Sequence, residues 1–228
     1  GLRSRAEGSL PPVNAGRAIG AEFLGTALLL LAVTGSGIMG ETLAAGNAAV
    51  ALLGNSLATG AALYVILSSL GPVSGAHLNP VVSLMAACDG SLPAGRLVGY
   101  LLAQFGGAVA GVWTVHLMFG QSVLQVSSKT RAGGPQLFSE LLATLLLLGL
   151  IRLATARGDT RIPAYVALTV LAGYWATAST FFANPAVTAA RALTDTFVGI
   201  RPADVLPIVG AQLLALGVVC LLVRLLRR

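Results

Sequence analysis

The sequence predicts an all-α membrane protein with six transmembrane helices and two re-entrant half-helices, arranged as an inverted repeat. Three observations predict this fold class. Hydrophobic residues make up 56% of the 228-residue chain and charged residues only 10%, whereas soluble domains contain about 25% charged residues. Two Asn-Pro pairs, Asn79-Pro80 and Asn184-Pro185, lie between long apolar stretches. The two halves of the chain also resemble each other.

Six apolar segments approach the roughly 17–25 residues that a helix needs to cross a bilayer. An even number of spans places both termini on the same side of the membrane. The predicted spans are about Ile19–Gly40, Ala48–Leu70, Gly95–Phe119, Leu137–Ala154, Ile162–Ala178 and Val205–Leu226.

The distribution of positive charge predicts the orientation of these spans. Lysine and arginine are enriched in cytoplasmic loops, so the side with more of them, which is that of the termini, is predicted to be cytoplasmic. The net charge of +6 is explained by this asymmetry, and no basic patch interleaved with aromatics indicates nucleic acid. Arg3, Arg5, Arg17, Arg96, Arg157, Arg161, Arg224, Arg227 and Arg228 fall on that side, and Lys129, Arg131 and Arg201 on the other.

The internal repeat divides the chain into two related parts. Glu22–Leu31 aligns with Glu140–Gly149, and each copy is followed by a second span and then by an Asn-Pro segment. Because three spans per copy is an odd number, the second copy enters the membrane from the opposite side, and a site is expected near the midplane between the copies. We expect a disordered cytoplasmic tail over 1–16 and one channel domain over 17–228, with half-repeats of about 17–119 and 137–228.

Each Asn-Pro pair predicts the start of a helix, because asparagine is a preferred N-cap and proline is tolerated in the first turn. The predicted helices, about Pro80–Ala87 and Pro185–Leu193, are too short to cross a bilayer. Non-helical backbone at membrane depth must be buried in protein or line water. The preceding residues, Ser74–Leu78 and Thr180–Ala183, are therefore expected to line a pore.

Two helix N-termini that meet at the centre of a membrane would each carry about half a positive charge. Together with the side-chain amides of Asn79 and Asn184, they would exclude cations and protons and let neutral, oxygen-bearing molecules pass. The sequence shows no nucleophile–base pair near these segments and no nucleotide-binding loop. It therefore predicts a passive pore, and neither an enzyme nor a cofactor or metal site.

Glu22 and Glu140 occupy corresponding positions in the two repeats and are costly inside a membrane. In one interpretation, each carboxylate carries a mobile proton, and the protein is a proton-coupled secondary transporter. In the other, each carboxylate accepts hydrogen bonds from the neighbouring re-entrant loop and braces it. Their symmetry favours the second interpretation. His77 is expected to brace its loop or to lie at the cytoplasmic mouth of the pore.

The two cysteines, Cys88 and Cys220, lie far apart in the sequence. Cytoplasmic thiols are normally reduced. We expect both to be packing residues, in neither a disulfide nor a metal site.

The chain resembles the aquaporin and aquaglyceroporin (major intrinsic protein) family, and its filter, described below, also resembles the pores of bacterial aquaglyceroporins associated with arsenic-resistance operons. The resemblance is carried by Ser74–Pro80, Asn184-Pro185-Ala186, the two glutamates and Gln104–Ala108. It implies a right-handed six-helix bundle, a homotetramer with one pore per subunit, and location in a bacterial inner membrane. It also assigns the central constriction to Asn79, Pro80, Val81, Asn184, Pro185 and Ala186.

The chain departs from the family at the selectivity filter. Val187 stands where members usually have arginine, and the resemblance places the other filter positions at Thr59, Ala172 and Phe181. With three small uncharged positions, the filter is expected to be wide, with Phe181 as one large wall. Arg191, one turn further along, lies in the outer vestibule or substitutes for the missing arginine.

Such a filter favours passage of neutral trivalent metalloid hydroxides such as arsenite, together with glycerol-like polyols and some water. The alternatives are a general facilitator for glycerol, urea and water, and the proton-coupled transporter already described.

Overall fold

The computed structural model describes residues 14–226, and all its regular elements are helical, with no β-strand in that part of the chain. The expected all-α class is thus confirmed. The elements are α1 (Ala15–Leu43), α2 (Ala48–Ser74), α3 (Pro80–Asp89), α4 (Ala94–Met118), α5 (Gly134–Ala156), α6 (Ile162–Ala176), α7 (Pro185–Ala190), the 3₁₀ turn η1 (Arg191–Leu193) and α8 (Pro202–Leu226).

Among residues 14–226, five helices are long and apolar enough to cross a membrane, namely α1, α2, α4, α5 and α8. The expected sixth span is α6, an apolar helix of only 15 residues. It is short because the chain leaves helical geometry at Thr177 and approaches α7 as an irregular segment.

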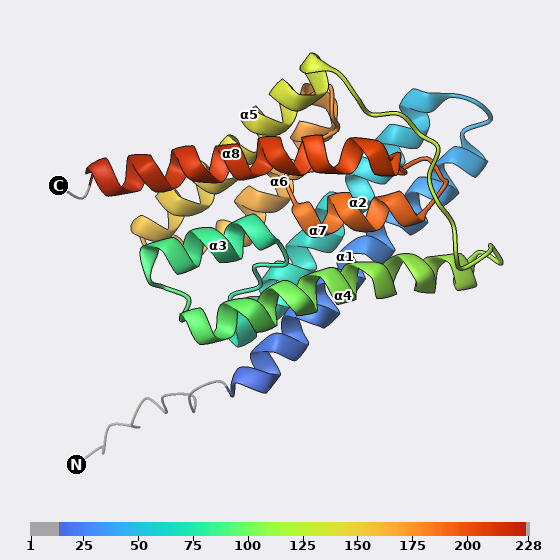
Figure 1. Cartoon of the computed structure of the whole chain (residues 1–228). Helices are drawn as coiled ribbons and strands as arrows, with labels where there is room; N and C mark the ends of the chain where they lie inside the picture. The colour runs from blue at the N-terminus through green and yellow to red at the C-terminus, as the bar shows by residue number, and fades with distance from the viewer. Residues whose placement is uncertain (1–13, 227–228) are drawn as a thin grey trace, which may run out of the picture.

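The arrangement has two distinct ends (Figure 1). Helix α1 begins and α8 ends at the same end, which we call the terminal side, while the linker between α4 and α5 crosses the opposite end, the linker side. Both predicted half-helices are present between the long helices. The first extends two residues beyond its expected end, to Asp89. The second is a single α-helical stretch, α7, completed by η1.

Local capping explains where several helices begin and end. The side chains of Asn14 and Asn47 accept hydrogen bonds from backbone N–H groups in the first turns of α1 and α2, as preferred N-caps do. Gly75 and Gly90 end α2 and α3 with φ values of 86° and 84°, a conformation that glycine adopts without strain. Helix α1 thus includes Ala15, which we expected in the tail; residues 1–13 of that expected tail lie outside the described residues.

Small residues let α1 and α4 approach closely, as is common between membrane helices. A Cβ atom on Gly107 would lie 2.2 Å from the carbonyl oxygen of Phe23, and one on Gly111 would lie 2.3 Å from that of Ala27. Gly107, within the segment Gln104–Ala108 that carries the family resemblance, therefore has a packing role: the backbone of α1 occupies the space where a side chain at Gly107 would be.

We predict that Gly107→Ala destabilises the protein although alanine is the better helix former. Alanine gains at most about 1 kcal/mol in helix propensity, whereas overpacking against backbone costs about 1–3 kcal/mol. Thermal unfolding of the purified protein in detergent should therefore show a lower midpoint. The matched control is Gly106→Ala, whose Cβ would meet only the Phe23 ring at an ordinary 3.5 Å. Equal midpoints for the two variants would contradict the close-approach explanation.

Candidate functional site

A cavity of about 390 Å³ runs through the bundle between the two re-entrant segments. On the terminal side its wall includes Asp89 and Arg152, which approach each other to 4.0 Å. On the linker side its wall includes Phe181 and Arg191. Most of the lining is apolar, so the few polar groups along the path decide which molecules can hydrogen-bond in it.

The two re-entrant segments are joined to each other at the centre. The side-chain amide of Asn79 donates to the carbonyl of Ala183 at 2.7 Å, and that of Asn184 donates to the carbonyl of Leu78 at 2.8 Å. Each Asn also caps its own half-helix, since its side-chain oxygen accepts from the N–H of Val81 or of Ala186. Both asparagines line the cavity, as expected.

The other four residues expected at the constriction lie behind it. Pro80, Val81, Pro185 and Ala186 are buried and do not line the cavity. Val81 packs with apolar side chains of α5 and α8. The side chain of Val81 therefore belongs to the protein core and not to the cavity wall.

The first re-entrant segment contains strained backbone held by one carboxylate. Ala76 and Leu78 have φ values of 44° and 51°, in the left-handed region that non-glycine residues enter at a cost. Glu22, fully buried, accepts hydrogen bonds from the N–H of His77 at 2.9 Å and of Leu78 at 2.7 Å, and from the hydroxyl of Ser74 at 2.7 Å.

The second segment repeats this arrangement. Phe181 and Ala183 have φ values of 58° and 46°. Glu140, also fully buried, accepts from the N–H of Phe182 and of Ala183, both at 2.8 Å. The geometry of both glutamates is that of the bracing interpretation.

Two glutamines complete the braces, and the sequence interpretation did not assign them this role. Gln104 on α4 donates to Glu22 at 2.8 Å and to the Ser83 hydroxyl at 2.8 Å. Gln212 on α8 donates to Glu140 at 2.8 Å and to the hydroxyl of Thr188 at 3.0 Å. Ser83 and Thr188 each stand four residues after the motif asparagine, a signal that alignment of the repeats could have revealed.

His77 makes contacts of the kind expected for a bracing residue. Its Nδ1 lies 3.0 Å from the Ser83 hydroxyl, and its ring packs edge-on against Tyr100 with centroids 5.4 Å apart. The residue also lines the cavity.

Three of the four residues expected in the filter line the cavity, namely Thr59, Phe181 and Val187. Ala172 does not line it and is exposed on the outer surface of α6. The cavity-facing residues of α6 include Val170 and Tyr174, one helical turn apart, and Ala172 lies between them on another face.

Tyr174 therefore takes the place that we expected Ala172 to occupy. Its hydroxyl donates to Thr59 Oγ1 at 3.3 Å, and its ring belongs to the same buried cluster as Phe181. A Cβ on Gly173 would lie 2.1 Å from the Phe181 ring, so the absence of a side chain there lets Phe181 pack against α6. The filter region thus has two aromatic residues, Tyr174 and Phe181, where only Phe181 was expected.

Arg191 lines the same cavity and is 2% exposed. Its guanidinium carbon lies 3.6 Å from the centroid of the Phe182 ring, and its Nε donates to the carbonyl of Val198. A second cation, Arg131 from the linker, lies 5.2 Å from the same ring. Arg191 is thus held at the cavity wall one turn beyond Val187.

Among residues 14–226, no group of three or more His, Cys, Asp or Glu side chains is placed to hold a metal ion. The site instead offers hydrogen-bond donors and acceptors along a narrow, mostly apolar path. Such an arrangement suits the passage of neutral molecules that carry oxygen atoms.

Comparison with known families matches residues 10–216 to the Major intrinsic protein family. Among curated proteins, aquaglyceroporin AqpS of Rhizobium meliloti (strain 1021) is 48% identical over 202 residues, which cover 89% of this chain and 85% of that protein. Probable aquaporin NIP7-1 of Arabidopsis thaliana is 34% identical over 154 residues, 64% of this chain and 53% of that protein. The X-ray structure of the aquaglyceroporin from Plasmodium falciparum has the same fold, with a TM-score of 0.64 at 22% identity over 93% of this chain and 100% of that one.

We predict that Glu22→Ala and Glu140→Ala lower stability before they change selectivity. Each removes the acceptor for at least two buried backbone N–H groups, and an unsatisfied buried group costs about 1–3 kcal/mol. The Gln variants keep one acceptor oxygen and should fall between wild type and Ala. Folded yield and thermal midpoint in detergent measure the effect.

The matched control is Glu41→Ala, since Glu41 is exposed near the end of α1. Unchanged stability in the variants of Glu22 and Glu140, combined with loss of proton-dependent uptake, would favour the transporter interpretation.

Proposed function

Because the chain belongs to the major intrinsic protein family, we propose that it is a passive channel whose filter passes trivalent metalloid hydroxides such as arsenite as well as glycerol-like polyols and some water. The coarser part of this function follows from the family: the chain is a multi-pass membrane channel for small neutral solutes such as glycerol and water, and not an enzyme. The finer part depends on the filter.

The observation that carries the proposal is Val187, a short apolar side chain on the cavity wall directly after Asn184-Pro185-Ala186. The family usually places a long cation there. Without that cation the path beside Phe181 keeps the width that an arginine side chain would fill. Arsenous acid at neutral pH is an uncharged molecule with three hydroxyls, so it resembles glycerol in size and hydrogen bonding.

Two aromatic residues make the proposed filter narrower than the sequence predicted. Tyr174 and Phe181 make the path less open than three small residues would, and the Tyr174 hydroxyl is already bonded to Thr59. The proposed filter therefore consists of Thr59, Tyr174, Phe181 and Val187, with a flat aromatic side that favours compact polyols over bulky solutes.

We assign Arg191 as the cation of this filter, displaced by one turn. Its guanidinium is buried at the cavity wall and held by the Phe182 ring and the Val198 carbonyl. A cation in that position adds to the positive half-helix ends in repelling positive ions. Its displacement leaves space beside Val187, so charge exclusion and a wide path coexist.

The geometry of Glu22 and Glu140 favours a passive channel over the proton-coupled transporter. Every hydrogen bond to Glu140 comes from an N–H donor, and a protonated carboxyl would place a proton against those donors. A carboxylate committed to bracing is poorly suited to releasing and rebinding a proton in each transport cycle.

The proposed orientation puts the terminal side in the cytoplasm of a bacterial inner membrane, as the arginine asymmetry suggests. We further propose a single channel domain over 17–228, built from half-repeats 17–119 and 137–228, and a homotetramer with one pore per subunit. The matching order of α1–α3 and α5–α7 supports the two half-repeats.

We predict solute flux without ionic current. Two helix N-termini and two amides at the centre, and a buried arginine at the filter, all disfavour a cation on the same path. Proteoliposomes should therefore conduct glycerol and show no proton or sodium conductance above that of empty liposomes. A cation current comparable to the solute flux would refute the proposed charge exclusion.

We predict that Val187→Arg lowers glycerol and arsenite flux much more than water flux. The new side chain would enter the path opposite Phe181, and a barrier higher by about 1.4 kcal/mol lowers a rate about tenfold. Stopped-flow light scattering measures water and glycerol, and arsenic content of the vesicles measures arsenite. Equal losses for all three solutes would indicate blockage or misfolding and remove support for the filter assignment.

We predict that Arg191→Ala changes solute selection more than Val187→Arg does, if Arg191 is the filter cation. The conservative control is Arg191→Lys, which keeps the charge and loses the planar stacking on Phe182. Partial rescue by Lys would separate charge from packing. Wild-type selectivity in Arg191→Ala would leave Arg191 as a vestibule residue only.

A further inference from the structure

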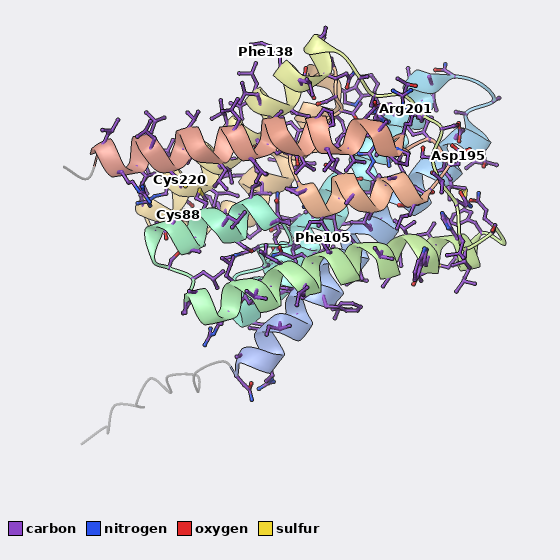
Figure 2. All side chains as sticks on the ribbon, in the orientation of Figure 1. Cys88, Phe105, Phe138, Asp195, Arg201 and Cys220 are labelled. Atoms are coloured by element: carbon purple, nitrogen blue, oxygen red, sulfur yellow. The ribbon has the colours of Figure 1, made fainter. Side chains whose placement is uncertain are left out.

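The chain contains two cysteines, and the structure brings them together at the terminal side. Cys88 lies at the end of α3 and Cys220 near the end of α8 (Figure 2). Both cysteines line one small cavity of about 20 Å³. Two residues that lie far apart in the sequence are thus neighbours at one small cavity.

The surroundings make this pair accessible and chemically distinctive. Cys88 is exposed and Cys220 half-buried, and both are free thiols. Asp89 and Arg224 line the same small cavity. Asp89 also lines the main cavity, so the thiols lie beside the mouth of the pore. A half-helix rises about 1.5 Å per residue, which places Cys88 about 13 Å from Asn79.

We propose that Cys88 and Cys220 together bind a thiophilic trivalent metalloid hydroxide, with arsenite as the probe. In the reaction As(OH)₃ + 2 RSH → (RS)₂AsOH + 2 H₂O, each thiol sulfur forms one bond to arsenic. Each thiol proton leaves with a displaced hydroxide as water, and one hydroxide stays on arsenic. No electron is transferred, so the step needs no oxidant or reductant.

The number of ligands favours this chemistry over a metal-ion site. Structural zinc takes four ligands, and no group of three or more His, Cys, Asp or Glu side chains is gathered within residues 14–226. Trivalent arsenic completes a three-coordinate pyramid with two sulfurs and its own hydroxide. Two thiols are sufficient for it.

The inference rests on the proposed function for its physiological meaning, because arsenite that crosses the pore would meet the pair at the terminal-side mouth. The binding chemistry itself does not depend on conduction. A dithiol there would bind the solute reversibly where it enters or leaves the path.

The test uses the full chain in detergent, reduced with a phosphine that is then removed. Titration with arsenite should protect both thiols from maleimide labelling, with one arsenic per chain by elemental analysis. A small dithiol such as dimercaptopropanol should remove the arsenic and restore labelling of both thiols. Linked sites gain about 10²–10⁴ in affinity through effective concentration, so Cys88→Ala and Cys220→Ala should each bind arsenite at least about 100-fold more weakly.

Single variants that bind as tightly as wild type would overturn the proposal, as would thiols that stay fully labelled at saturating arsenite. A disulfide that reforms in air before arsenite is added, and prevents binding, would assign the pair to redox cross-linking instead. Cys88→Ala/Cys220→Ala should leave glycerol flux unchanged, which shows that the channel is intact.

Flux measurements separate this inference from the proposed function. Arsenite binding without arsenite flux in wild-type proteoliposomes would refute the conduction proposal and leave the thiol site standing. Arsenite flux without arsenite binding would refute the thiol site and leave the conduction proposal standing.

Discussion

Two carboxylates within the membrane, Glu22 and Glu140, hold the backbone that forms the centre of the channel. Each re-entrant segment contains non-glycine residues in left-handed conformations, and such residues cost about 1–3 kcal/mol each. Hydrogen bonds to a charged group contribute about 1.5–3 kcal/mol each, and Glu22 accepts four of them. The hydrogen bonds are therefore large enough to offset the backbone strain. Without the carboxylates, the loops would relax and the half-helices would lose their positions.

The position of the half-helices in turn sets what the path presents to a solute. Asn79 and Asn184 each use part of their amide to bond the opposite loop, so the two half-helix ends meet at a fixed separation. The side chains behind them, such as Val81 and Ala186, fill the core. The polar character of the centre comes from two amides and exposed backbone, whereas the proposed solute preference depends on the filter residues on the linker side.

Features that depend on local sequence could be predicted. The long spans follow from hydropathy, the half-helix starts follow from Asn-Pro capping, and the bracing glutamates follow from repeat symmetry. Features that depend on helix phase and loop path could not. Tyr174 rather than Ala172 lines the cavity because the irregular segment before Asn184 breaks a simple count of residues. The placement of Cys88 and Cys220 at one small cavity depends on how α3 packs against α8, and no local pattern encodes it.

The reciprocal bonds of Asn79 and Asn184 also bear on how the protein is assembled during synthesis. The amide of Asn79 bonds the carbonyl of Ala183, which is 104 residues later in the chain. The hydrogen bonds that hold Glu140 include one from Gln212 in the last helix. Contacts of such long sequence separation form late. The first half can insert its helices as they emerge, but its loop stays incomplete until the second half has entered from the other side. A chain truncated before α8 would therefore lack part of the hydrogen bonding that holds the second re-entrant segment. Quality-control proteases could then degrade it, although most of its spans were already inserted.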